Sequence, residues 1–248
     1  MKWIAALLLT MAAGYAQAAD KTLRFYGYAY DLKTNRYIYT EVHRHKVTDD
    51  RWVSGSITYY NPEDLKIGVK TLDFTKNPYI PVFRLEQKPY GYLEGIRNIG
   101  AQIGLFRQEN RKAELETGNI DIENDMASDS GFHSYIRDHF DQLMRGELVN
   151  FRLVVPGQMD SYRFRLRRVE DTRFEDETAA VIKVEPDSLL RLVVDPLQLT
   201  YDPKSRKLLE YRGISNIHDP ETGKVYVARI VYPTQKPEDA PKKLPSLN

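Results

Sequence analysis

Residues 23–46, LRFYGYAYDLKTNRYIYTEVHRHK, decide the fold class of this chain. Two segments with alternating side chains, Leu23–Tyr30 and Arg36–Lys46, flank a short polar turn. Alternation with a period of two is typical of β-strands, and tyrosines suit strands because their rings pack while their hydroxyls stay hydrated. This stretch therefore predicts an antiparallel β-hairpin.

The loop of this hairpin predicts its register. If Leu32–Asn35 is a four-residue loop closed by Asp31 opposite Arg36, the facing residues follow directly from the sequence. Aromatic cross-strand pairs would then stabilise the ladder. The expected pairs are Tyr30 with Tyr37, Tyr28 with Tyr39, Tyr26 with Glu41 and Arg24 with His43.

Similar alternation recurs along much of the chain and is interrupted by turn sequences rich in Pro, Asn, Asp and Gly. Leu189–Tyr201 is apolar on both faces over much of its length, which is typical of a central strand. The expected further strands are 53–60, 67–74, 90–96, 102–108, 112–116, 149–155, 162–167, 179–184, 189–201, 207–215 and 224–232.

Residues 130–146 break this alternation. Their apolar side chains follow helical spacing, Asp129 or Ser130 could cap the start, and Gly146 could end the helix. One helix is too few to supply the crossovers of a parallel sheet. We therefore expect a mainly β fold: a strongly curved antiparallel sheet, or unclosed β-barrel, with one amphipathic helix (130–146) packed on its concave side.

The first eighteen residues have the features of an export signal. Lys2 precedes a short apolar run, and Ala16-Gln17-Ala18 offers small residues at a cleavage site. The run is too short to span a bilayer and no second long run follows, so no transmembrane anchor is expected. We expect a periplasmic protein with a signal peptide at 1–18, a single β-rich domain at 19–232, and a disordered, Pro- and Lys-rich tail at 233–248.

Charge and composition narrow the function further. Without Lys2 the basic residues fall from 36 to 35, which equals the 35 acidic residues. This balance argues against a nucleic-acid-binding protein, which usually carries a basic excess. The chain has no cysteine, so it has neither disulfides nor thiolate chemistry.

Two rows of polar side chains are candidate binding sites. Glu41, His43 and His45 would project from one face of a strand, as zinc ligands can, although a solvated strand end at an exposed sheet edge is the favoured interpretation. An arginine row at 163–168 could bind anionic groups, although neutralisation by the acidic residues at 170–177 is favoured.

The sequence contains none of the common catalytic motifs. The sequence has no Gly-x-Ser-x-Gly elbow, phosphate-binding loop, dinucleotide fingerprint or His-Glu-x-x-His pattern. His133 and His139 are six residues apart on the expected helix, and His218 lies in an expected turn. All three are interpreted as structural histidines, and no catalytic residue, metal ligand or cofactor is assigned.

One segment resembles a known family. Leu192-Val193-Val194-Asp195-Pro196-Leu197, Tyr201-Asp202 and residues 209–217 (LEYRGISNI) are similar to stretches of exported bacterial proteins grouped as domain of unknown function 3108. With the strand–helix–strand layout, the chain resembles the periplasmic lipoprotein-carrier superfamily. That resemblance implies an unclosed β-barrel that binds acyl chains or other apolar molecules.

We therefore predict a non-catalytic periplasmic binding protein for an apolar or lipid-like ligand of the cell envelope. The candidate ligand-binding residues are Leu190, Leu192, Val194, Phe132, Ile136 and Phe140. Two alternatives remain open: a structural or partner-binding envelope protein without a cavity, and an enzyme or zinc protein with an unrecognised site.

Overall fold

The computed structural model describes residues 20–187 and 196–247. One large, unclosed sheet dominates it, and 58% of the chain lies in strands, so the predicted fold class is confirmed. The strands follow the order β8-β7-β6-β5-β4-β3-β2-β1-β15-β14-β13-β12-β11-β10-β9, and all neighbours are antiparallel except β9 and β10.

The described elements have the following bounds: β1 Asp20–Asp31, β2 Tyr37–Thr48, β3 Arg51–Tyr60, β4 Lys66–Asp73, β5 Val82–Gln87, β6 Tyr92–Ile99, β7 Gln102–Gln108, β8 Glu116–Asp121, β9 Met126–Ser128, η1 Asp129–Gly131, α1 Phe132–Asp138, α2 Phe140–Met144, β10 Val149–Val155, η2 Pro156–Gln158, β11 Asp160–Phe174, β12 Glu177–Pro186, β13 Leu197–Tyr201, β14 Leu208–His218 and β15 Val225–Val231.

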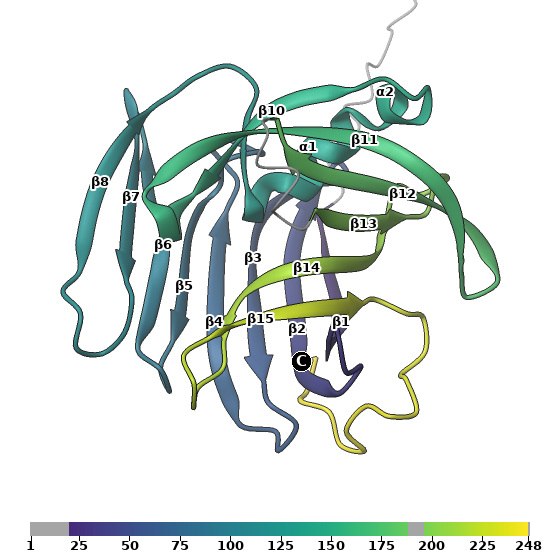
Figure 1. Cartoon of the computed structure of the whole chain (residues 1–248), viewed down its shortest axis with the longest axis horizontal. Helices are drawn as coiled ribbons and strands as arrows, with labels where there is room; N and C mark the ends of the chain where they lie inside the picture. The colour runs from purple at the N-terminus through teal and green to yellow at the C-terminus, as the bar shows by residue number, and fades with distance from the viewer. Residues whose placement is uncertain (1–19, 188–195, 248) are drawn as a thin grey trace, which may run out of the picture.

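The sheet folds back on itself as two arms. The first arm is β1–β8 and the second is β9–β15, and Figure 1 shows the strands of the second arm crossing in front of those of the first. A short antiparallel ladder joins the arms, in which Tyr28–Asp31 of β1 pairs with Ala228–Val231 of β15. Residues 20–27 of β1 pair with β2 alone, so the arms separate beyond Tyr28.

The first hairpin forms as expected at its turn but not along its length. The Asp31 amide donates to the Arg36 carbonyl at 2.8 Å, and Tyr30 faces Tyr37. A β-bulge between Ala29 and Tyr30 then shifts the register by one residue. The predicted pairs beyond the bulge are therefore wrong, and the observed ones are Tyr28 with Thr40, Tyr26 with Val42, Phe25 with His43 and Arg24 with Arg44.

The predicted helix is divided into two. α1 and α2 meet at His139, whose ring nitrogen lies 2.9 Å from the Tyr135 carbonyl oxygen. Gly146 has a φ of 81° just after α2, as expected for a residue that ends a helix. The predicted side-chain cap is wrong, because Gly131 precedes α1 and Asp129 binds Lys70 instead.

The helices lie between the two arms. Tyr135 of α1 contacts the rings of Tyr79, which follows β4, and of Phe151 on β10. Ile136, Phe140 and Leu143 are fully buried in a core shared with β10–β13. The amphipathic pattern therefore predicted the buried face correctly.

The C-terminal tail forms no helix or strand over 232–247, yet it lies against the outer face of β1. Tyr30 donates its hydroxyl to Asp239 at 2.8 Å, and Tyr26 donates to the Pro245 carbonyl at 2.7 Å. These contacts place Asp239 and Pro245 against tyrosines of β1, and the disorder of 233–248 stays a prediction.

The arginine row of β11 is neutralised mainly by β12. Arg165 and Arg167 both pair with Glu185, at 2.5 and 3.4 Å, whereas only Arg168 finds a partner in the acidic run, Asp171. The predicted neutralisation thus takes place largely across the ladder rather than along the chain.

Candidate functional site

A cavity with two adjoining chambers lies between the arms. The inner chamber has a volume of about 200 Å³ and is bounded by β2–β4, η1, the start of α1 and β13–β15. The outer chamber, of about 430 Å³, reaches β1 and the turn before β14. Five side chains line both chambers, which therefore adjoin: His43, Trp52, His133, Leu208 and Tyr232.

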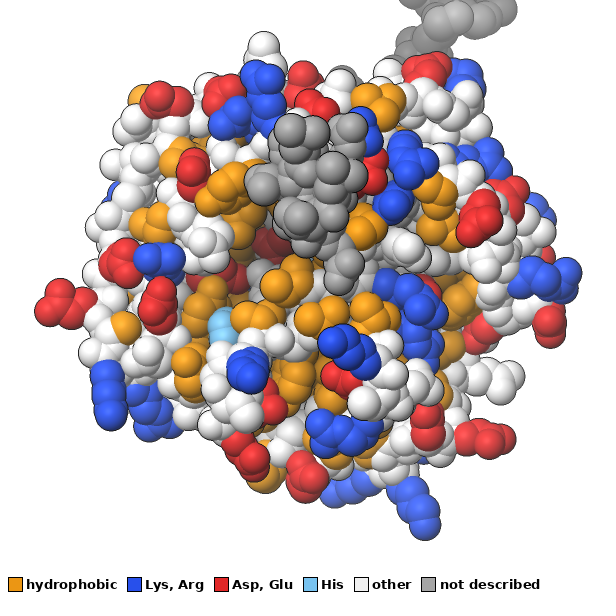
Figure 2. Space-filling view, viewed as in Figure 1, with side chains coloured by type: hydrophobic (Ala, Val, Ile, Leu, Met, Phe, Trp, Pro, Cys, Tyr) orange, Lys and Arg blue, Asp and Glu red, His pale blue; other side chains and the backbone are white. Residues whose placement is uncertain are grey.

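The opening of the outer chamber follows from the separation of the arms. Leu23 and Phe25 line it, and both lie in the part of β1 that has no pairing with β15. On the face shown in Figure 2, acidic and basic side chains are interspersed around the rim and hydrophobic side chains gather toward the centre. The described surface therefore offers an apolar interior behind a mixed polar rim.

A row of polar side chains on β2 enters this interior. Glu41, His43 and His45 are all buried, with 5%, 6% and 1% of their surface exposed. The prediction of a solvated strand end is wrong because β2 lies between β1 and β3 rather than at a sheet edge. The bulge near the hairpin turn sets His43 opposite Phe25 and Glu41 opposite Gly27 on β1, and His45 faces Gly55 on β3.

Two glycines make room for the row. A Cβ atom at Gly27 would lie 2.7 Å from Glu41 Oε2, and one at Gly55 would lie 2.2 Å from His45 Nδ1. Aromatic rings occupy the remaining space, since Phe25 stacks on His43 at 4.4 Å and Trp52 stacks on His45 at 4.0 Å between ring centroids. The polar row is therefore accommodated by specific neighbours.

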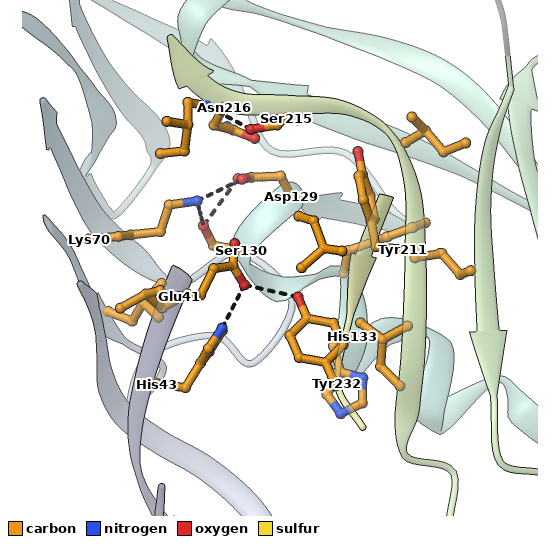
Figure 3. A pocket seen from close by; sticks show the side chains of 18 of the residues that line it. Glu41, His43, Lys70, Asp129, Ser130, His133, Tyr211, Ser215, Asn216 and Tyr232 are labelled. Carbon is orange, nitrogen blue, oxygen red and sulfur yellow. Dashed lines mark hydrogen bonds and ion pairs between the residues drawn. The ribbon is translucent and has the colours of Figure 1, made fainter. Parts of the chain in front are cut away.

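Hydrogen bonds link the row internally. His43 Nε2 lies 2.8 Å from Glu41 Oε2, and His43 Nδ1 lies 3.1 Å from His45 Nε2. Tyr232 donates its hydroxyl to the same Glu41 oxygen at 3.0 Å, as Figure 3 shows. Burial, followed by repulsion from His43, lowers the pKa of His45 to about 3.

Glu41 influences several phenols around the inner chamber. Burial, followed by the charge of Glu41, raises the pKa values of Tyr39, Tyr59 and Tyr232 well above the usual range. These phenols are neutral at physiological pH, so they can act as hydrogen-bonding groups and as aromatic walls.

A second polar group lies across the inner chamber (Figure 3). Lys70 is 5% exposed, and its ammonium donates to Asp129 at 2.9 Å and to Ser130 at 3.3 Å. Ser130 also lies 3.1 Å from the other Asp129 oxygen. Lys70 and Ser130 thus both bind Asp129, and the three side chains form a closed hydrogen-bonded cluster.

His133 stands at the junction of the chambers. Its Nδ1 lies 3.1 Å from the Tyr201 hydroxyl, and its ring contacts Trp52. Burial, followed by the nearby Arg137, lowers its pKa to about 3, so the imidazole is neutral. Interpreted from the sequence as a structural histidine, it also lines both chambers.

The predicted ligand-binding residues fall in three places. Phe132 lines the inner chamber, whereas Ile136 and Phe140 belong to the packed core and line neither chamber. Leu190, Leu192 and Val194 lie outside the described residues. The second arm contributes Val184, Leu197, Leu199 and Leu208 to the chamber walls instead.

Several residues of the site had no signal in the sequence. Nothing in the sequence around Lys70, Asp129 and Tyr232 marks them as site residues. Only the fold brings them together around the inner chamber. Among the described residues, no group of three or more His, Asp or Glu side chains is arranged to hold a metal ion.

Comparisons with protein-family models, with curated proteins and with solved structures found no match. Within the described ranges, no helix is long and apolar enough to cross a bilayer.

Proposed function

We propose that this protein binds an apolar or lipid-like small molecule in the two-chambered cavity and does not transform it. The observation that carries this proposal is a pair of adjoining chambers between the arms, lined largely by aromatic and aliphatic side chains. We infer that a passage connects them at the five side chains that they share. Small-molecule sites commonly enclose roughly 300–1,000 Å³ and place a few polar groups within apolar walls. The adjoining chambers have that character.

The polar groups of the cavity favour binding over catalysis. Lys70, Asp129 and Ser130 satisfy one another, and His43 is engaged by Glu41 and His45. Such mutually satisfied groups line the cavity without being left unpaired when water leaves it.

Export is part of the same proposal. We propose that residues 1–18 are removed and that the protein acts in the periplasm, as the N-terminal sequence and the resemblance to lipoprotein carriers suggest. Intact-mass measurement of protein recovered from the periplasm should give a chain that begins at Ala19. A retained Met1 would contradict it.

The binding proposal is tested with an acyl-chain fluorophore whose emission rises in an apolar environment. Saturable binding is expected for the full chain, and Leu208→Trp should abolish it by filling the passage. Leu209→Trp is the matched control, because Leu209 lines neither chamber. Equal binding by the two variants, with unchanged far-UV circular dichroism, would place the ligand elsewhere.

A further inference from the structure

Glu41 is a buried carboxylate with an unoccupied oxygen. Its Oε2 accepts both described hydrogen bonds, from His43 and Tyr232. Its Oε1 takes no hydrogen bond from any described residue, and the Glu41 side chain lines the inner chamber. Figure 3 shows the Glu41 carboxylate within this pocket.

The charge of Glu41 is also poorly balanced. His43 is the only described basic side chain within ion-pair distance of it, since Lys70 pairs with Asp129. Buried carboxylates are costly unless a cation or several donors compensate them. A ligand with a positive charge would supply that compensation.

The walls suit a particular kind of cation. Tyr39, Tyr59 and Tyr232 line the inner chamber together with Glu41. Tyr59 faces Glu41 across the β2–β3 ladder, and Tyr232 donates to it. Aromatic faces attract organic ammonium groups through their quadrupoles, and this attraction strengthens when water is excluded. At the outer chamber, Arg137 and Arg206 are paired with Asp50 and Asp141. Arg24 and Lys207 line it too and are in none of the described ion pairs, so the preference for a cation comes from the inner chamber.

We propose that the inner chamber recognises an ammonium group, with Glu41 as its counter-ion and the tyrosines as its walls. This inference rests on the proposed function and names its ligand class: an organic amine whose apolar part extends past Trp52 toward the outer chamber.

The test is calorimetric titration of the full chain at pH 7 with three probes of similar shape: 2-phenylethylammonium, 2-phenylethanol and 3-phenylpropionate. The ammonium probe should bind at least about tenfold more tightly than the alcohol, and the carboxylate most weakly. Glu41→Gln should remove this preference, because the amide keeps the acceptor for Tyr232 and loses the charge. Glu147→Gln, at an exposed ion pair, should leave it intact.

The outcomes separate this inference from the proposed function. Equal binding of the ammonium and alcohol probes would overturn the ammonium site and leave a general apolar binding site. If neither these probes nor the acyl fluorophore bind saturably, both the ammonium site and the proposed binding function are overturned. If Glu41→Gln fails to fold, the probe preference of the unsubstituted protein still decides.

Discussion

The polar row of β2 and the helix-bound core of the second arm are both buried, yet only the second was predicted. In the core, Ile136, Phe140 and Leu143 repeat at helical spacing, and apolar side chains gain by leaving water wherever they pack. In the row, Glu41, His43 and His45 are buried because partners on other strands surround them: Trp52 and Gly55 on β3, Gly27 on β1 and the distant Tyr232. Apolar periodicity thus predicts burial, whereas polar periodicity leaves it open.

The largest effect is expected in the core. Phe140→Ala should lower the free energy of unfolding by about 3–5 kcal/mol, because Phe140 is 1% exposed and its removal leaves a cavity. Urea unfolding followed by far-UV circular dichroism measures it. A loss below about 1 kcal/mol would mean that α2 is only loosely held, and the contrast with the polar row would fail.

Acid should destabilise the fold through its buried neutral histidines, of which His45 belongs to the row. The pKa of His45 is lowered to about 3 in the folded protein and returns to about 6.5 on unfolding. Below pH 6.5 the unfolded chain therefore binds a proton at His45, whereas the folded chain does not. Stability from this group is complete above pH 6.5 and falls by roughly 2 kcal/mol by pH 5. Urea unfolding at pH 7, 6 and 5 measures the loss, and in His45→Gln that part of the pH dependence should disappear.

His139→Gln is the matched control for this experiment, because His139 lines neither chamber. An identical pH dependence in His45→Gln and the unsubstituted protein would show that His45 is not the buried neutral group described.

Space for the row is tested at its glycines. Gly55→Ala should cost about 1–3 kcal/mol, because the added Cβ would lie 2.2 Å from His45 Nδ1 on a central strand. Gly100→Ala, with no atom within 4 Å of the added Cβ, is the control. Thermal unfolding compares the two variants. Equal unfolding midpoints would mean that the space beside His45 accommodates the added Cβ atom.

The smallest effect is expected outside both regions. Asp239→Ala removes the acceptor of the Tyr30 hydroxyl and should cost about 0.5–1.5 kcal/mol. Limited proteolysis should then cut the tail faster while the domain persists. Unchanged proteolysis would mean that the tail is held by Tyr26 and its other contacts instead.

The sequence predicted what depends on local pattern. The curved sheet, the hairpin turn and the buried helix face follow from alternation, loop length and helical spacing. The bulge at Ala29 and Tyr30 has no local signal and reversed the expected facing of the first strand. The site was missed for a related reason, because Glu41 and Tyr232 are 191 residues apart and meet only through the β1–β15 ladder.

The most direct test of the ammonium site is a crystal structure of the full chain with 2-(4-bromophenyl)ethylammonium. The anomalous scattering of bromine locates the ligand. We expect the ammonium beside Glu41 Oε1 and the bromine toward the outer chamber, near Leu208 and Tyr232, which line both chambers. Chambers filled by side chains, with bromine only on the outer surface, would contradict it.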